Sequence, residues 1–199
     1  MPADPGPTGR PVAPLVEATV VARAQDGDVG AFEQLVRRYE GEIFRLAYRM
    51  LSDRGEAEDV VQDSFVLVWR QLPTLQDPQA FHAWLYHLAT RRCLDVLRAR
   101  ARRRTDLAAT DDALDDRVDD SAARGRGPAE LAEVAAQVRG LDAVLATLPD
   151  EQRACWVLKE LHDLSYPEIA YVVGVPVSTV RGRLARARRE LARGMASWQ

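Results

Sequence analysis

The sequence has 199 residues, enough for one large domain or two small ones, and its 47% hydrophobic and 29% charged residues are ordinary for a globular protein. The net charge of −3 argues against a protein that simply coats nucleic acid. No apolar run approaches the roughly 18 residues that cross a bilayer, and no signal-peptide core is present, so we expect a cytoplasmic protein without membrane insertion. Cys93 and Cys155 stand far apart without metal-ligand spacing, which predicts two buried, reduced thiols.

The first third of the chain predicts a leader followed by helices. Residues 1–14 are rich in proline and glycine and lack apolar periodicity, so we predict a disordered leader. A short helix is plausible over residues 15–25. Asp28 is placed to cap a longer amphipathic helix that ends near Met50, because apolar residues recur there at intervals of three and four.

A helix predicted over residues 56–72 has an unusual outer face. Its core stripe comprises Val61, Phe65, Val68 and Leu72. The opposite face and its flanks carry Asp59, Gln62, Asp63, Val66, Trp69 and Arg70. An exposed apolar residue among carboxylates favours a protein partner with basic side chains. The alternative is that Val66 and Trp69 pack under a neighbouring helix.

The next predicted helix, over residues 81–98, follows a proline-bracketed loop over residues 74–80. Leu85, Ala89, Cys93, Val96 and Leu97 point one way. The other side carries Trp84, His87, Arg91 and Arg98. An aromatic ring among basic residues suits stacking on unpaired bases together with phosphate attraction, although a single tryptophan is more often a core residue.

Residues 105–130 contain seven aspartates and little apolar surface, which predicts a flexible acidic linker between two domains, residues 15–104 and 131–199. Helices are predicted over residues 131–148 and again after Pro149, with Asp150 as the cap of the second. No strand pattern rises above the helical periodicity. The predicted fold class is therefore all-α, with two small helical domains.

Residues 164–191 predict a helix, a tight turn and a second helix. Ser165 and Glu168 have capping-box spacing, and Gly174 suits a helix end. The second helix buries one apolar stripe. Its remaining surface carries Ser178, Thr179, Arg181, Gly182, Arg183, Arg186 and Arg189. This pattern indicates a helix-turn-helix that reads duplex DNA, the alternative being a structural hairpin with a solvated arginine face.

Catalytic chemistry has no visible basis in the sequence. No Gly-rich phosphate loop occurs, and the three histidines have no ligand spacing with cysteines or acids. We therefore expect no cofactor, no metal and no enzymatic activity.

Four segments together resemble the extracytoplasmic-function (ECF) sigma factors, the small two-domain class of bacterial transcription initiation factor. They read AFEQLVRRYEGEIFRLAYRML, AEDVVQDSFVLVWRQL, FHAWLYHLATRRCLDVLR and LPDEQRACWVLKELHDLSYPEIAYVVGVPVSTVRGRLARARREL. They cover most of residues 31–191. The helix-turn-helix alone would also fit response-regulator output domains; the EDVVQDSF segment after a long amphipathic helix separates the two classes.

The resemblance implies specific partners. The face with Asp59, Gln62, Asp63 and Val66 would dock on the β′ coiled coil of core RNA polymerase. The loop over residues 74–80 and the helix after it would capture an unstacked base of the promoter's minus-ten element. The C-terminal domain would read the minus-thirty-five element and contact the β flap, the acidic linker would enter the RNA exit path, and an anti-sigma factor would regulate the chain.

The sequence departs from the family pattern at two places in the base-capturing region. Arg91 stands where family members commonly have asparagine, and the loop reads LQDPQAF in place of an Arg-Gly-Asp-like run. The minus-ten preference therefore cannot be carried over. The remaining alternative for the whole chain is a DNA-binding regulator that never enters polymerase, with residues 15–104 as a sensor or dimerisation domain.

Overall fold

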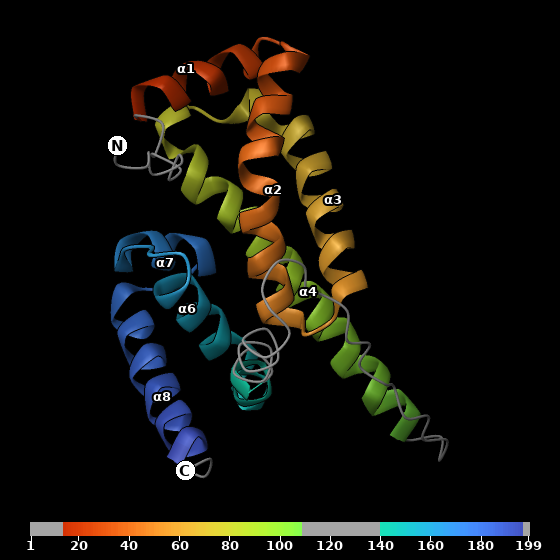
Figure 1. Cartoon of the computed structure of the whole chain (residues 1–199), viewed down its shortest axis with the longest axis vertical. Coiled ribbons are helices and arrows are strands. Elements are labelled where there is room, and N and C mark those ends of the chain that lie inside the picture. Colours follow the sequence, from red (N-terminus) through yellow and green to blue (C-terminus); the bar gives the residue numbers. More distant parts are fainter. Residues whose placement is uncertain (1–13, 109–139, 197–199) are drawn as a thin grey trace, which may run out of the picture.

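The computed structural model describes residues 14–108 and 140–196, and all regular structure within these ranges is helical. The elements are α1 (Pro14–Gln25), α2 (Val29–Leu51), α3 (Arg54–Gln71), the short 3-10 turns η1 (Leu72–Thr74) and η2 (Pro78–Ala80), α4 (Phe81–Ala108), a helix over residues 140–147, α6 (Asp150–Glu160), α7 (Tyr166–Val173) and α8 (Val177–Ala196). Figure 1 shows α1–α4 as one group and α6–α8 as a second beside it. The all-α prediction is confirmed.

The N-terminal domain is a bundle in which α1 lies across one end of α2, α3 and α4 (Figure 1). Asp28 caps α2 as predicted, since its carboxylate accepts a hydrogen bond from the Ala31 amide at 3.0 Å. The core of α2 is a stripe of residues exposed by 2% or less, comprising Ala31, Leu35, Tyr39, Ile43, Leu46, Ala47, Met50 and Leu51. This stripe packs on both α3 and α4.

Three sequence predictions for this domain need correction. Pro14 is the first residue of α1 and so does not belong to a disordered leader as predicted, while residues 1–13 lie outside the described residues. Val60 is buried in α3, whereas Val61 is only partly buried at the edge of the core, because the buried face of the helix runs through Ala57, Val60, Ser64, Phe65 and Val68. The helix predicted to end at Arg98 continues to Ala108, so residues 105–108 are helical and not part of a linker as predicted. Alanine and arginine are strong helix formers and make up much of this extension.

The C-terminal domain is built from the helix over residues 140–147 and α6, α7 and α8. Pro149 is the N-cap of α6 and Asp150 its first helical residue, so Asp150 does not cap it as predicted. The buried hydrophobic residues described are Val144, Leu145, Leu148, Ala154, Cys155, Val157, Leu158, Leu164, Ile169, Val172, Val180, Leu184, Ala187 and Leu191. Both cysteines are free and buried, as expected. The predicted helix before residue 140 and the acidic linker after residue 108 lie outside the described residues.

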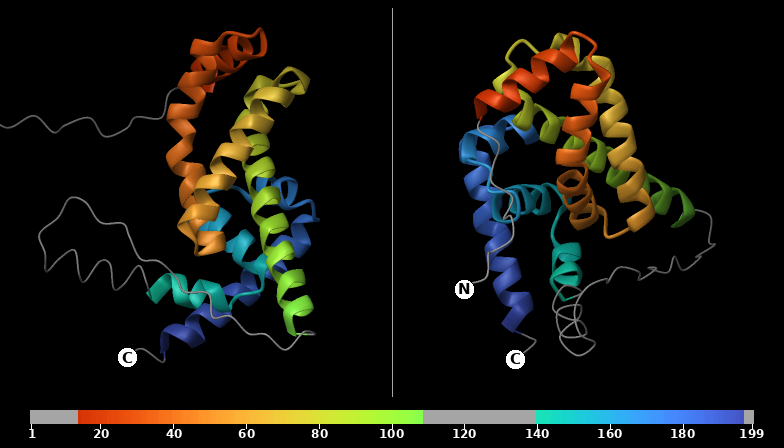
Figure 2. Two further views of the ribbon diagram at one scale, coloured as in Figure 1. Left: turned by 90° about the vertical axis from the view of Figure 1, so that its right-hand side faces the viewer. Right: turned by 45° about the horizontal axis from the view of Figure 1, so that its top comes forward.

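The two domains pack against each other. Helix α7 lies along α4, and α6 contacts both α2 and α4. Figure 2 shows α7 and α6 beside the middle of the N-terminal bundle, while α8 extends away from it.

Candidate nucleic-acid and protein interfaces

The outer face of α3 is held in place by its buried stripe and by a cap. The Asp53 carboxylate accepts a hydrogen bond from the Glu56 amide at 2.8 Å, which fixes the start of the helix. Opposite the stripe, Asp59 and Gln62 are exposed, and the Val66 residue is 49% exposed. These three predicted docking residues therefore share one accessible surface.

Trp69 extends this surface at the far end of α3. Its ring lies 4.8 Å from that of Phe32 on α2, yet 41% of the residue remains exposed. The alternative that Val66 and Trp69 are covered by a neighbouring helix is not seen in the described part of the chain. Exposed apolar surface of this kind, next to carboxylates, fits a protein partner.

Asp63, the fourth predicted docking residue, is engaged within the chain. Its carboxylate accepts a hydrogen bond from Nε of Arg92 on α4 at 2.9 Å, and the two side chains are 48% and 44% exposed. The pair lies in a groove of about 610 Å³ between α3 and α4. One wall carries Asp59, Gln62 and Asp63, and the other carries arginines that include Arg102 and Arg103. A partner that binds Asp63 must therefore displace or share Arg92.

The four residues predicted on the outer side of α4 do not form one open surface. Arg91 and Arg98 are exposed, and Arg98 pairs with Asp95 at 2.8 Å. Trp84 is half-buried, with its ring 6.2 Å from that of Phe81. His87 is half-buried and contacts the C-terminal domain: its Nδ1 lies 2.9 Å from the carbonyl oxygen of Val172 in α7.

The helix-turn-helix forms as the sequence predicts. The Ser165 amide donates to the Glu168 carboxylate at 2.7 Å, and the Ser165 hydroxyl accepts from the Glu168 amide at 3.4 Å, completing the capping box. Burial acts to raise the pKa of Glu168, but hydrogen bonds from Ser165 outweigh it and lower the pKa overall. Gly174 ends α7 at φ +68°, a left-handed conformation that glycine adopts without strain.

The arginines of α8 divide into two groups. Arg183 pairs with Glu151 of α6, its side chain only 15% exposed, and Arg188 pairs with Glu160 of α6 at 2.7 Å. The residues that remain exposed on the outward face include Ser178, Arg181, Arg186 and Arg189, with Thr179 and Gly182 half-buried between them. Arg181 also lies 5.8 Å from the Tyr166 ring centroid. The structure therefore offers Arg181, Arg186 and Arg189 to a ligand and holds Arg183 against its own domain.

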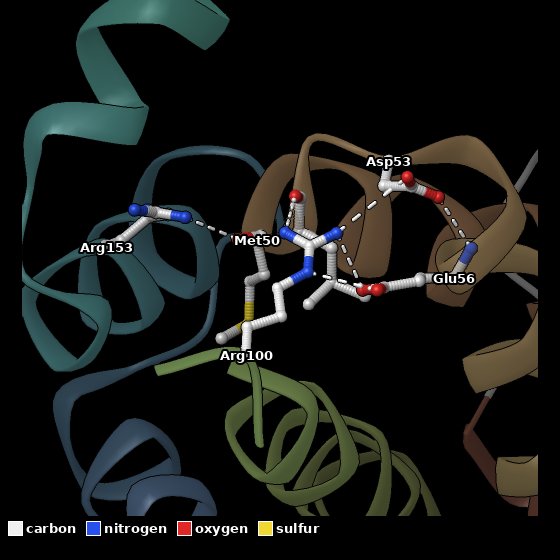
Figure 3. A network of polar contacts seen from close by, with 6 residues as sticks. Met50, Asp53, Glu56, Arg100 and Arg153 are labelled. Atoms are coloured by element: carbon white, nitrogen blue, oxygen red, sulfur yellow. Dashed lines mark hydrogen bonds and ion pairs between the residues drawn. The ribbon is translucent and has the colours of Figure 1, made fainter. Parts of the chain in front are cut away.

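A polar network that sequence reasoning missed joins the two domains at the C-terminus of α2 (Figure 3). Arg153 of α6 is 6% exposed and donates to the Met50 carbonyl oxygen at 2.5 Å. It also donates to the carbonyl oxygens of Ala146 and Leu148, both at 3.1 Å. The one sequence signal was an arginine within the apolar stripe of α6, where a buried charge needs partners.

Arg100 of α4 completes the network from the other side (Figure 3). It donates to the Leu51 carbonyl oxygen at 2.8 Å and pairs with Glu56 at 2.7 Å. Consecutive carbonyls of α2 are thus bound by guanidinium groups from different domains. Cations at a helix C-terminus are favourable because unpaired carbonyls concentrate negative potential there.

His162 occupies a second, half-buried position between the domains. Its Nδ1 lies 2.8 Å from the Tyr86 hydroxyl, which is 3.1 Å from the Glu42 carboxylate. This geometry fits a chain in which Nδ1–H donates to Tyr86 and Tyr86 donates to Glu42. His162 Nε2 is buried and has no hydrogen-bond partner in the described part of the chain. Burial, followed by the nearby charges of Arg45 and His82, lowers the pKa of His162 to about 4, while Asp163 opposes the shift.

Within the described residues, no cluster of three or more His, Cys, Asp or Glu side chains is arranged to hold a metal ion. None of the described helices combines the length and apolar character needed to span a membrane.

The fold defines a two-domain helical protein with a C-terminal helix-turn-helix, and its N-terminal domain presents a separate exposed face of acidic, amide and apolar side chains on α3. The sigma-70 region 2 model matches residues 35–103, and the sigma-70 region 4 model matches residues 139–191. The chain belongs to the family of ECF RNA polymerase sigma factors, and it directs core RNA polymerase to promoters. The match of region 2 to the first domain excludes the alternative of a sensor or dimerisation domain.

Curated relatives agree with this assignment. The chain is 33% identical over 177 residues to the RNA polymerase sigma-H factor of Pseudomonas aeruginosa, covering 88% of this chain and 92% of that protein. It is 33% identical over 178 residues to the ECF RNA polymerase sigma factor SigE of Mycolicibacterium smegmatis, covering 89% of this chain and 66% of that protein. The chain thus spans about two thirds of the length of SigE and nearly all of sigma-H.

Solved structures share the fold. The structure of CnrH in complex with the cytosolic domain of CnrY has a TM-score of 0.66 at 27% identity, covering 91% of this chain and 97% of that chain. The sigma factor RpoE of Bartonella quintana, in complex with the anti-sigma factor NepR, has a TM-score of 0.67 at 21% identity, covering 84% and 98%.

Proposed function

We propose that this ECF sigma factor binds core polymerase through Asp59, Gln62, Asp63 and Val66. The observation that carries the assignment is the outer face of α3, where exposed carboxylate, amide and valine side chains share one surface opposite the buried stripe. The expected partner surface is the β′ coiled coil, which would bring basic side chains to Asp59 and apolar contact to Val66.

The two domains divide the reading of the promoter. In this assignment residues 15–104 bind the minus-ten element through the α4 residues Trp84, His87, Arg91 and Arg98. Residues 131–199 read the minus-thirty-five element through Ser178, Thr179, Arg181 and Gly182 near the start of α8, and clamp phosphates with Arg186 and Arg189. Arg183 acts as a positioning residue for α8, since its guanidinium is committed to Glu151.

The remaining partners follow from the family. The C-terminal domain contacts the β flap, and the acidic linker over residues 105–130 enters the RNA exit path. An anti-sigma factor regulates the chain, as two structural relatives were solved with CnrY and with the anti-sigma factor NepR. The protein acts in the bacterial cytoplasm, without a cofactor and without catalytic activity of its own.

Charge reversal on α3 tests the docking assignment. Asp59→Arg should weaken binding to core polymerase at least about tenfold while leaving thermal unfolding unchanged, because Asp59 is exposed and makes no core contact. Asp63→Arg should weaken it further, although this variant also breaks the Arg92 pair. Glu40→Arg on α2 is the matched control, an exposed acid outside this face.

Gel filtration with core enzyme and run-off transcription on genomic templates provide the readouts. Normal co-elution of Asp59→Arg would contradict the docking assignment. Transcripts that start at discrete sites only in the presence of the chain would identify the promoters it directs.

A further inference from the structure

We infer that Gln25, the last residue of α1, is a positioning residue for promoter reading: its side-chain amide holds the loop over residues 74–80 in the orientation that a minus-ten base meets. The inference deepens the proposed function and rests on it, because it takes this loop and α4 as the minus-ten surface of the N-terminal domain. It gives α1 a part in promoter specificity.

The Gln25 amide bridges two carbonyl oxygens where the chain leaves α3. Its Nε2 donates to the Leu72 carbonyl oxygen at 3.0 Å and to the Leu75 carbonyl oxygen at 2.7 Å. A glutamine amide nitrogen carries two hydrogens, so one side chain can serve both acceptors. The two acceptors lie 47 and 50 positions from Gln25 in the sequence, so this contact ties the loop to a separate helix.

The Leu75 carbonyl needs a donor from outside the loop because the helix stops there. The backbone is extended at Leu75, with ψ 111°. In a continuing α-helix the backbone N–H of Gln79 would donate to this carbonyl, but it donates to the Asp77 carboxylate at 2.9 Å instead. Pro78 has no N–H to offer. Gln25 therefore satisfies an acceptor that the local chain leaves open.

Helix α1 is a firm support for this contact. Val21 and Ala24 are 0% and 4% exposed and fix α1 on the bundle. The Tyr39 hydroxyl of α2 donates to the Glu17 carboxylate at 2.7 Å, which anchors the other end of α1. Figure 1 shows α1 across the end of the bundle where η1 and η2 lie, and α1 contacts both turns. The Gln25 amide is thus held in a fixed place relative to the loop.

The bonds within the loop set its shape but not its direction. The Thr74 hydroxyl donates to the Gln71 carbonyl oxygen at 2.7 Å, and the Ala80 amide donates to the Asp77 carbonyl oxygen at 3.0 Å. These bonds are local and would survive if the loop swung as a unit. A binding site on a loop discriminates between ligands only when supporting groups hold it within a fraction of an ångström. Gln25 supplies that support from outside.

Substitutions at Gln25 separate hydrogen-bond donation from side-chain size. Gln25→Leu keeps much of the bulk and removes the donor. Gln25→Lys keeps a donor, as Lys159 does when it donates to the Leu164 carbonyl oxygen at 3.1 Å. Gln34→Leu is the matched control, the same change at an exposed glutamine on α2. Circular dichroism checks that each variant is folded.

Hydrogen–deuterium exchange of the full free chain is the first readout. Gln25→Leu should speed exchange of the amides in residues 72–80 by about tenfold, because the loop loses two hydrogen bonds that hold it closed on α1. Gln25→Lys and Gln34→Leu should stay close to the native chain.

Base preference of the holoenzyme is the second readout. The probe is a fork template from a promoter found by run-off transcription, with a duplex minus-thirty-five element and a single-stranded minus-ten element, made with each base in turn at every single-stranded position. Native holoenzyme should prefer one base at one or more of these positions. Gln25→Leu should reduce that preference by about tenfold, because fewer chains have the loop in the binding orientation. Affinity for core polymerase and for the duplex minus-thirty-five element should stay unchanged, and Gln25→Lys should restore the preference.

Native-like exchange or native-like base preference in Gln25→Leu would overturn the inference. An equal loss of affinity for every template would overturn it too, because Gln25 would then stabilise the domain without acting on specificity. Failure of the proposed function gives a different result: the native holoenzyme itself would show no base preference in the single strand, and the positioning role would fall with the minus-ten assignment.

Discussion

At the scale of single residues, the arginines of α8 differ more in their partners than in their positions along the helix. Arg183 and Arg188 face acids on α6, while Arg186 and Arg189 are exposed and point outward. A guanidinium already paired within its own domain contributes little to phosphate binding, because a phosphate would have to compete with a carboxylate held at fixed geometry. Equal charge therefore does not mean equal function.

Alanine substitution should separate these groups. Arg186→Ala and Arg189→Ala should each weaken duplex binding for all sequences and lower the slope of log affinity against log salt by about one unit. Arg183→Ala is the matched comparison and should leave the slope unchanged while costing about 0.5–1 kcal/mol of stability. Fluorescence anisotropy of a labelled duplex at several salt concentrations, with urea unfolding alongside, measures both quantities. A reduced slope in Arg183→Ala would contradict the division.

Arg153 donates hydrogen bonds to three main-chain carbonyl oxygens. Arg153→Met keeps much of the side-chain volume but leaves the Met50, Ala146 and Leu148 carbonyls without their donor, at an expected cost of about 3 kcal/mol. Urea unfolding of the full chain measures the loss. Lys159→Met is a useful comparison, because Lys159 donates to only one carbonyl, that of Leu164, and should cost less. Equal losses would show that the number of carbonyls is not what matters.

At the scale of elements, the sequence predicted best where a helix carries its own start and stop signals. The Ser165–Glu168 capping box and Gly174 placed α7 correctly, and Asp28 placed the start of α2. The end of α4 was missed because its last turns carry no stop residue. Whether Val60 or Val61 faces inward was missed too, since adjacent valines give no periodic signal.

Alanine substitutions at the two glycines of the helix-turn-helix should change the free energy of unfolding in opposite directions. Gly174→Ala should cost about 1 kcal/mol, because φ is +68° there and an L side chain is strained in that conformation. Gly182→Ala should instead stabilise α8 by about 0.5–1 kcal/mol, since an added Cβ would meet only the Arg186 guanidinium, at 3.7 Å. It should nevertheless weaken duplex binding if α8 approaches DNA closely at this point. Thermal unfolding measures the two stability changes and fluorescence anisotropy measures duplex binding. A stabilised Gly174→Ala or a destabilised Gly182→Ala would contradict the prediction.

At the scale of the whole molecule, the site depends on a domain arrangement that sequence patterns do not encode. The periodicity predicted His87 on the side of its helix that faces away from the core, but in the structure His87 contacts Tyr171, which lies 84 positions further along the chain (171 − 87) and on another domain. Periodicity describes one element at a time. Contacts such as Arg153 to Met50 arise only once separate elements have been packed together.

Acidification should weaken the packed form. The pKa of His162 lies near 4 in the structure, against 6.5 when the ring is solvated, so the opened or unfolded chain binds the proton more tightly. Stability should therefore fall as the pH drops from about 6.5 towards 4, by at most about 3 kcal/mol in total. Urea unfolding at a series of pH values measures this dependence. His162→Gln should flatten it, and an unchanged profile would assign the acid response to other groups.

The two guanidinium groups at the end of α2 couple the stability of its last turn to the contact between the two domains. Arg153 and Arg100 bind the adjacent Met50 and Leu51 carbonyls from opposite domains, and the Ser52 amide closes the helix on Tyr48 at 2.8 Å. When Arg153 leaves, the Met50 carbonyl returns to water and the turn loses one of its two external supports. Amide hydrogens in this turn should then exchange with deuterium faster.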